Sequence, residues 1–128
     1  KKNKTKENFS KKNIKENNLS IIRYIDKIKS NFDFILVAVI SPLLITRKIA
    51  KKKFKKQYYE IYVKCNLNIL VKRDTKGLYK LAKKSKLKNL IGYKSKIKYE
   101  KSNYKKIVVD TGKLTINETL KKIYAKII

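Results

Sequence analysis

The chain has 128 residues, and its 36 lysines and arginines against nine acidic residues give a formal net charge of +27. A hydrophobic fraction of 42% excludes general disorder and suits one globular domain with a modest core. With no histidine and one cysteine, the sequence excludes a Ser-His-Asp or Cys-His nucleophile system, an internal disulfide framework and a zinc site with several such ligands.

The positive charge has two possible sources. A basic surface attracts polyanions such as RNA, DNA, anionic membranes or nucleotides. Only three of the basic residues are arginines, however, and proteins that read nucleic acid depend on arginine for bidentate and stacking contacts. Lysine, asparagine, isoleucine and tyrosine also share A/T-rich codons. We therefore favour lysines on solvated faces and keep a functional polyanion surface as the alternative.

The first predicted elements are a polar start and a helix. Residues 1–12 are polar and basic, and we expect them to be loose. Behind them, apolar residues recur in steps of four, three and four, which predicts one face of a helix. These residues are Ile21, Ile25, Ile28 and Phe32.

A nearly continuous apolar run follows. DFILVAVI (33–40) is rich in β-branched residues and predicts a strand buried on both faces, as in a parallel sheet. Ser41-Pro42 ends it, because proline cannot continue the hydrogen-bonded ladder. ITRKIAKKKFKK (45–56) predicts a short basic helix, and YYEIYVKC (58–65) predicts a second strand.

Two short helices and a third strand are predicted next. LNILVKR (67–73) and the stretch 78–86 favour helices, and the polar residues 93–106 favour a loop. IVVD (107–110) predicts a third buried strand, which Thr111-Gly112 stops.

The C-terminal part predicts a capped helix. Thr115-x-x-Glu118 is a capping box, in which each side chain satisfies the other residue's backbone amide. Helices therefore alternate with buried strands along the chain. This order predicts an α/β fold with a parallel sheet.

Candidate ligand contacts lie after the predicted strands, because open parallel sheets bind ligands beyond the carboxyl ends of their strands. Ser41 follows the first strand, Asn66 and Asn68 follow the second, and residues 110–112 follow the third. From position alone, Ser41 as a ligand contact and Ser41 as a turn residue before proline are equally favoured.

A second candidate is the polar cluster of Arg73, Asp74, Lys76 and Gly77, which leads into a predicted helix. Glycine permits a sharp turn, and the start of a helix offers free amides to anions. From composition alone, a solvated lysine face is the favoured interpretation.

Several longer segments point to a known family. They are VAVISP (37–42), YEIYVKCNLNILVKRDTKGLYKLAKKSKLKNLIG (59–92) and IVVDTGKLTINETL (107–120). From Phe9 onward the chain resembles the back part of adenylylsulfate kinase, and the RDTKGLYK segment with its later KNLIG is the most specific match. The resemblance implies a three-layer, P-loop kinase-like α/β fold with a parallel sheet, with residues 13–128 as its domain.

The same resemblance implies an activity. Adenylylsulfate kinase transfers the γ-phosphate of ATP to the 3′-hydroxyl of adenylylsulfate, giving 3′-phosphoadenylylsulfate in sulfate assimilation. ATP and Mg²⁺ are the implied cofactors, and adenylylsulfate is the implied substrate. A homodimer or a fused sulfate adenylyltransferase is an implied arrangement.

Individual residues inherit roles from the matched motifs. Ser41 takes the phosphoserine-type catalytic position, and Arg73 and Thr111 take positions on ATP. The substrate-binding positions are Phe9, Asn17, Lys76, Gly77, Leu78 and Leu90. Among these, Phe9 would stack on the adenine of adenylylsulfate, and Lys76 to Leu78 would form a lid. Leu90 stands where the family has a second stacking aromatic, and it can pack on an adenine but lacks a π face.

The sequence also departs from the family. The G-x-x-x-x-G-K-[ST] loop that holds the ATP phosphates is absent, because Gly77, Gly92 and Gly112 are the only glycines and none has that context. We therefore expect a C-terminal part that lacks the N-terminal strand or strands and the P-loop. Most of the ATP and Mg²⁺ binding would belong to that missing part, and we expect little or no turnover from this chain alone.

Two other functions stay open. One is a small basic RNA-binding, ribosome-associated protein, although the predicted burial of the Tyr58–Tyr62 region disfavours nucleic acid as a partner. The other is a non-catalytic remnant that pairs with another subunit through an open sheet edge. The longest apolar stretch, 32–45, contains Asp33 and Pro42 and is too short to cross a bilayer, and KKNKTKENFS has no signal-peptide core. We expect no membrane partner and a cytoplasmic protein.

Overall fold

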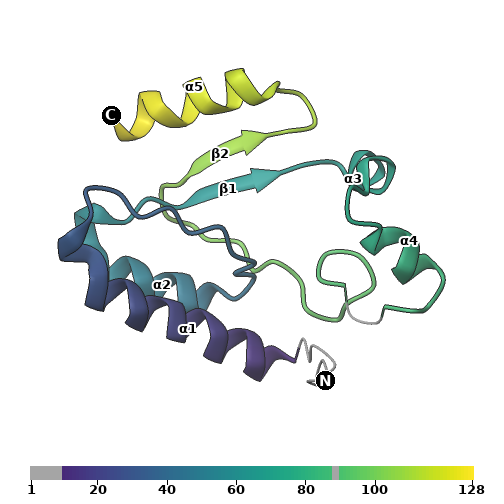
Figure 1. Ribbon diagram of the computed structural model, residues 1–128, viewed down its shortest axis with the longest axis horizontal. Coiled ribbons are helices and arrows are strands. Elements are labelled where there is room, and N and C mark those ends of the chain that lie inside the picture. The colour runs from purple at the N-terminus through teal and green to yellow at the C-terminus, as the bar shows by residue number, and fades with distance from the viewer. Residues whose placement is uncertain (1–9, 88–89) are drawn as a thin grey trace.

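The computed structural model describes residues 10–87 and 90–128 (Figure 1). Two single-turn 3₁₀ helices, η1 and η2, follow the first two α-helices. In chain order the elements are α1 (Lys11–Ile28), η1 (Lys29–Asn31), α2 (Leu44–Phe54), η2 (Lys55–Gln57), β1 (Ile61–Lys64), α3 (Leu67–Arg73), α4 (Leu78–Lys83), β2 (Ile107–Asp110) and α5 (Ile116–Ile127).

Helix α1 begins with a side-chain cap. The Asn13 amide donates to Ser10 Oγ at 3.1 Å, which satisfies one of the helix's free N–H groups. Buried Ile14, Asn18 and Ile22 follow at spacings of four and form the inner face of the helix. The prediction that residues 1–12 are loose is therefore wrong for Lys11 and Lys12, because this cap extends the helix to them. The first nine residues lie outside the described part.

The sheet consists of β1 and β2, which pair in parallel with Ile61 opposite Ile107 and Lys64 opposite Asp110. Helix α5 contacts β2, whereas α1 contacts α2. In Figure 1, α5 lies on the β2 side of the pair, and α1 and α2 lie on the β1 side. Helices α3 and α4 lie beyond the carboxyl ends of both strands (Figure 1). The predicted α/β fold with a parallel sheet is confirmed.

The predicted strand at 33–40 is wrong. This segment forms no strand, and all its residues except the half-buried Ile35 are exposed, with Leu36 at 89% and Phe34 at 72%. A strand in a parallel sheet requires a neighbour for its backbone N–H and C=O groups. Among the described residues, β1 pairs with β2 and no segment pairs with 33–40, so the apolar run stays irregular.

The remaining predicted elements are present, some with altered bounds. The apolar face predicted for the first helix is only partly right, because Ile21, Ile25 and Ile28 are half-buried and Phe32 lies beyond α1 at 57% exposure. The second strand is confined to Ile61–Lys64, the residues that pair with β2, and α4 ends at Lys83 rather than at residue 86. The helix at 67–73 and the strand at 107–110 have the predicted bounds. The capping box is present, with Glu118 N donating to Thr115 Oγ1 at 3.3 Å and Thr115 N donating to Glu118 Oε2 at 2.7 Å.

The core of the described part is small. Its buried apolar side chains are Ile14, Ile22, Leu43, Ala50, Ala82 and Val109. Leu43 immediately precedes α2, and Val109 lies in β2, so the two best-buried large side chains belong to the turn and to the sheet. None of the described helices is long and apolar enough to cross a membrane.

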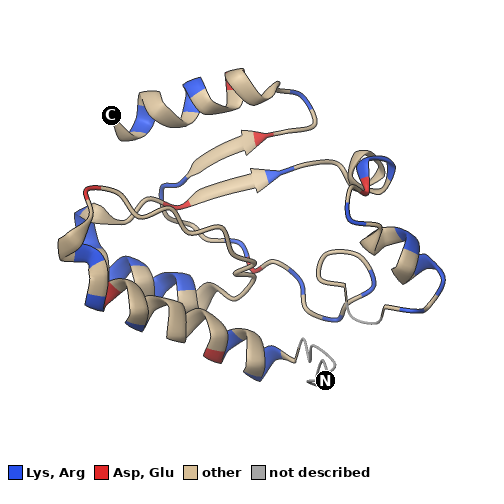
Figure 2. Cartoon of the chain, viewed as in Figure 1, with Lys and Arg blue, Asp and Glu red and all other residues tan. Residues whose placement is uncertain are grey.

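The basic residues are spread over the whole fold. Figure 2 shows lysine and arginine on every α-helix and on several loops, with acidic residues between them at a few places. This distribution follows the solvated faces of many elements, which supports the interpretation that most lysines are surface residues.

Candidate functional site

The Ser41-Pro42 turn is fixed by an unusual series of hydrogen bonds. Four successive backbone carbonyls, from residue 40 to residue 43, each accept one hydrogen bond. The donors are Asn18 Nδ2 to Ile40 O (3.3 Å), Arg47 Nη1 to Ser41 O (2.5 Å), Glu100 N to Pro42 O (2.8 Å) and Thr46 Oγ1 to Leu43 O (2.9 Å). The turn is thus held from α1, from α2 and from the loop before β2.

The Ser41 hydroxyl itself has one close polar neighbour. Ser41 Oγ lies 3.3 Å from Thr46 Oγ1, and either oxygen can donate in this pair. Since Thr46 also donates to the Leu43 carbonyl at 2.9 Å, the Ser41 hydroxyl proton is the one available for their contact. The side chain is therefore oriented by the first turn of α2.

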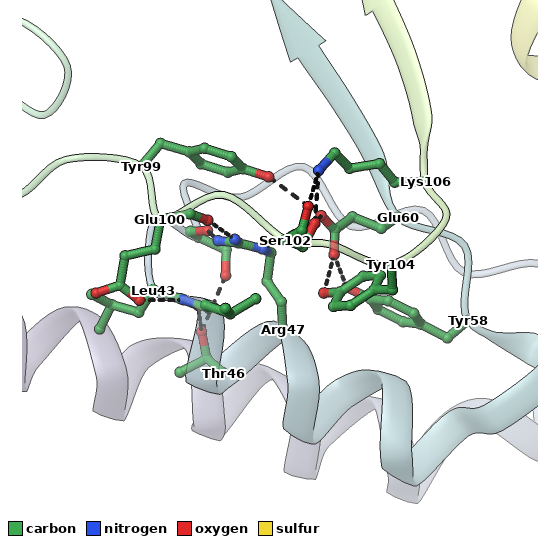
Figure 3. A network of polar contacts seen from close by, with 12 residues as sticks. Leu43, Thr46, Arg47, Tyr58, Glu60, Tyr99, Glu100, Ser102, Tyr104 and Lys106 are labelled. Atoms are coloured by element: carbon green, nitrogen blue, oxygen red, sulfur yellow. Dashed lines mark hydrogen bonds and ion pairs between the residues drawn. The ribbon is translucent and has the colours of Figure 1, made fainter.

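Arg47 connects this turn to the rest of the site (Figure 3). Its side chain is buried, with 5% of the residue exposed. Nη1 donates to the Ser41 carbonyl, Nη2 donates to the Glu100 carbonyl, and Nε lies 3.5 Å from Glu60 Oε1 as an ion pair. The guanidinium also lies over the Tyr99 ring, 4.3 Å from its centroid.

The Glu60 carboxylate, which pairs with Arg47, also accepts hydrogen bonds from several hydroxyl groups. It accepts from Tyr58 (3.3 Å), Tyr99 (3.3 Å), Tyr104 (2.5 Å) and Ser102 (3.4 Å), as Figure 3 shows. Burial, together with the hydrogen bond to the Glu60 carboxylate, raises the pKa of Tyr104 to about 12. Burial and Glu60 also raise the pKa of Tyr58. Both phenols are therefore neutral donors at neutral pH.

Glu100 adds a second carboxylate to the turn. Its Oε2 accepts from the Leu44 amide at 2.7 Å, and Lys11 Nζ lies 3.5 Å from Oε1. The Leu44 hydrogen bond, with help from Lys11, holds the pKa of Glu100 below its ordinary value. An ionised Glu100 thereby satisfies a free amide at the start of α2.

A groove of about 620 Å³ opens beside the turn. Its walls come from one side of α1, from the segment 32–39 and from residues 56–61, and its polar lining includes Ser41, Thr46 and Arg47. The volume lies within the range of small-molecule sites, which combine apolar walls with a few fixed polar groups. Ser41 therefore meets a groove of ligand size, as the interpretation of Ser41 as a ligand contact requires.

The second candidate cluster lies at α3 and α4. Arg73 Nη2 donates to the Thr111 carbonyl at 2.6 Å, so the two predicted ATP-binding positions are adjacent. Gly77 has φ +66°, which confirms the predicted sharp turn. The expectation of free helix amides is wrong, because Asp74 accepts from the amides of Tyr79 (3.0 Å) and Lys80 (2.9 Å).

The other predicted substrate positions are not gathered around the groove. Asn17, Lys76 and Leu78 are exposed, and Leu90 is half-buried. Phe9 lies outside the described residues. Of the predicted substrate-binding residues that the structure describes, none lines the groove beside Ser41.

Sequence reasoning missed the residues that build the turn, namely Asn18, Thr46, Arg47, Glu60 and Glu100. One signal was available, since Glu60 interrupts an apolar, tyrosine-rich run and Arg47 is one of three arginines. Among the described residues there is no group of three or more Asp, Glu, His or Cys residues that could hold a metal ion.

Comparison with known proteins agrees with the resemblance seen in the motifs. The family model for adenylylsulphate kinase matches residues 2–110. The chain is 32% identical over 105 residues to the probable adenylyl-sulfate kinase of Archaeoglobus fulgidus, covering 82% of this chain and 66% of the relative. It is 32% identical over 120 residues to the adenylyl-sulfate kinase of Bacillus pumilus, covering 90% of this chain and 58% of the relative.

A longer relative is the probable bifunctional SAT/APS kinase 2 of Sorangium cellulosum. It is 35% identical over 120 residues, which cover 93% of this chain and 20% of the relative. The chain thus spans less than two thirds of the length of each of these three relatives. The match of the family model over most of the sequence establishes that the chain belongs to the adenylylsulfate kinase family.

Proposed function

We propose that this chain supplies the adenylylsulfate side and the lid of an adenylylsulfate kinase active site. The reaction transfers the γ-phosphate of ATP to the 3′-hydroxyl of adenylylsulfate, giving ADP and 3′-phosphoadenylylsulfate. The new bond joins the 3′-oxygen to the γ-phosphorus. The bond from the γ-phosphorus to the β–γ bridging oxygen breaks, ADP leaves with that oxygen, and the 3′-hydroxyl proton passes to solvent. The main support is the Ser41 turn, whose carbonyls from residue 40 to residue 43 each accept a hydrogen bond and whose Ser41 is among the residues that line a groove of ligand size.

In this proposal, Ser41 is the catalytic, phosphoserine-type position. Arg73 and Thr111 contact ATP, and their direct hydrogen bond is consistent with a shared role. Adenylylsulfate is bound by Phe9, Asn17, Lys76, Gly77, Leu78 and Leu90. Phosphoryl transfer depends mainly on positioning and on charge neutralisation, which lysine and arginine side chains near the phosphates provide.

ATP and Mg²⁺ complete the proposed site. Mg²⁺ bound to ATP would neutralise the charge that develops on the phosphates. The loop that normally cradles these phosphates has no counterpart among the 128 residues. We therefore propose that the 128-residue chain binds adenylylsulfate but shows little or no turnover without a phosphate-binding loop.

The test is an ADP-release assay with Mg²⁺, ATP and adenylylsulfate, on this chain and on the gene's whole reading frame. We expect adenylylsulfate-dependent ADP release from a frame that carries a P-loop, and none above background from this chain. A frame with a P-loop that releases no such ADP would overturn the kinase assignment. Turnover by the 128-residue chain would overturn the requirement for the loop.

A second candidate is pairing with another subunit through β1, and it has one specific observation behind it. Among the described residues, β1 pairs on one side with β2 and borders the groove on the other. An unpaired strand edge can bind another strand. Size-exclusion chromatography at several concentrations tests this, since a homodimer elutes earlier as concentration rises. We also propose a cytoplasmic location. A fused sulfate adenylyltransferase is a further proposed arrangement, which the name of the Sorangium relative suggests.

A further inference from the structure

The buried guanidinium of Arg47 makes contacts that one lysine could not replace. Its two terminal nitrogens donate to backbone carbonyls from different segments, Ser41 in the turn and Glu100 in the loop, the latter 53 residues away in the sequence. Arginine provides several donors in a rigid planar fork, whereas lysine provides a single flexible ammonium. The position therefore requires the shape of arginine as well as its charge.

Glu60 and Tyr99 fix the orientation of that fork. Glu60 lies against Nε at 3.5 Å, and the Tyr99 ring covers one face of the guanidinium at 4.3 Å. Tyr99 is itself stacked on Tyr62 of β1, with ring centroids 4.5 Å apart. Contacts through Tyr99 thus fix the orientation of Arg47 relative to strand β1. Because Arg47 donates to the Ser41 carbonyl, the position of that carbonyl is fixed relative to the same strand.

We propose that Arg47 is a positioning residue, which sets the place of Ser41 at the groove through its carbonyl and joins the turn to the Glu100 loop. This inference rests on the proposed function, in which Ser41 meets the ligand. Arg47 acts on ligand binding through geometry, because its terminal nitrogens are engaged by backbone carbonyls. Displacing a site residue by about 1 Å can cost on the order of a hundredfold in function.

The experiment compares Arg47→Lys and Arg47→Ala with Arg23→Ala. Arg23 is exposed on α1, so its replacement removes one positive charge away from the turn. Adenylylsulfate affinity is measured by isothermal titration calorimetry, at a temperature where circular dichroism shows every variant folded. We expect both Arg47 variants to bind at least about tenfold more weakly, which is about 1.4 kcal/mol, and Arg23→Ala to bind within about twofold of the original chain.

The lysine variant separates positioning from other roles. If Arg47 only attracted the anionic ligand, Arg47→Lys would keep the affinity, because the charge is retained. If it only stabilised the fold, the folded fraction of each variant would bind with unchanged affinity. Added methylguanidine should restore binding to Arg47→Ala, where the side chain leaves a space for it, and should not improve Arg47→Lys. Normal affinity in Arg47→Lys overturns the inference.

NMR spectra of the chain without ligand test the positioning role of Arg47 independently of adenylylsulfate binding. In ¹H–¹⁵N spectra, we expect the amide signals of Ser41 and Leu44 to shift in Arg47→Lys and to stay in place in Arg23→Ala. Failure of the original chain to bind adenylylsulfate would overturn the proposed function, while the spectra would still decide whether Arg47 sets the turn. Unshifted signals in Arg47→Lys would overturn the positioning role.

Discussion

The Ser41-Pro42 turn and the apolar segment 33–39 are neighbours in the chain, and they are held in opposite ways. In the turn, each carbonyl from residue 40 to residue 43 accepts a hydrogen bond, and Leu43 is 1% exposed. In residues 33–39, within the part of the chain that the structure describes, no backbone group forms a hydrogen bond. Leu36 and Phe34 there are largely exposed.

This difference shows what fixes the candidate catalytic serine. In a parallel sheet, the position of a residue after a strand is usually set by the strand itself. Here the preceding segment has no strand partner among the described residues, and side chains of α1 and α2 with the Glu100 loop fix the turn instead. The geometry of Ser41 should therefore depend on those polar contacts and little on segment 33–39.

The largest expected change in the free energy of unfolding comes from removing the Glu60 carboxylate. Glu60→Ala leaves Arg47 buried without its ion-pair partner and deprives three tyrosine hydroxyls of their acceptor. Breaking a buried ion pair from one side typically costs about 3–5 kcal/mol. We expect a loss of about 4 kcal/mol in the free energy of unfolding, measured by urea denaturation.

Glu16→Ala is the matched control, because Glu16 is exposed on α1 and its removal should change stability by less than about 0.5 kcal/mol. If Glu60→Ala leaves too little folded protein to measure, Glu60→Gln keeps the shape of the side chain and should be destabilising to a smaller degree. Equal stabilities for the Glu60 and Glu16 variants would mean that the polar contacts do not hold the turn.

Two leucine variants test the comparison directly. Leu43→Ala removes a buried side chain in the turn and should cost about 3 kcal/mol, through lost burial and a residual cavity. Leu36→Ala removes the same atoms from an 89% exposed side chain and should cost less than about 0.5 kcal/mol. Both are measured by urea denaturation. A similar cost for the two would show that segment 33–39 is packed in solution as the turn is.

The sequence predicted the elements whose cues are local. The strand at 107–110 is a short β-branched run stopped by Thr111-Gly112, and the capping box needs only Thr115 and Glu118. The run at 33–40 has a stronger apolar signal, yet it forms no strand. Strand formation depends on a neighbour elsewhere in the chain, and an apolar pattern carries no information on whether that neighbour is present.

The residues of the candidate site also fall into two groups, those with local sequence cues and those placed by contacts between distant segments. Ser41 was put forward because it follows a predicted strand, which the described residues do not form, so its role stays a prediction. The sharp turn at Gly77 was predicted from glycine itself and is present. Arg47, Glu60 and Glu100 were missed because their contacts join α2, the approach to β1 and the loop before β2. Such contacts appear only when the fold brings these segments together.

A smaller effect should separate two adjacent asparagines of α1. Asn18 is buried and donates to the Ile40 carbonyl, whereas Asn17 is exposed. Asn18→Ala should lower the free energy of unfolding by about 1–2 kcal/mol, because the carbonyl loses its donor. Asn17→Ala should leave stability unchanged and should weaken adenylylsulfate binding, as its proposed role requires. Urea denaturation and titration calorimetry on both variants measure the two properties, and a stability loss confined to Asn17→Ala would contradict the arrangement.

The smallest effect is a pH-dependent one at Tyr104. Its hydroxyl donates to Glu60 at 2.5 Å, so Tyr104→Phe should lower the free energy of unfolding by about 1 kcal/mol at pH 7.

The pKa of Tyr104 is about 12 in the folded chain and about 10 in an unfolded one, so between these values the unfolded state releases the proton first. The folded state then binds more protons, and the stability that Tyr104 contributes falls as the pH rises. The difference in unfolding free energy between the original chain and Tyr104→Phe should therefore shrink from pH 9 to pH 11. Tyr24→Phe, which removes the hydroxyl of an exposed tyrosine on α1, is the matched control. A difference that stays constant over this range would mean that the Tyr104 hydroxyl is not held by Glu60 in solution.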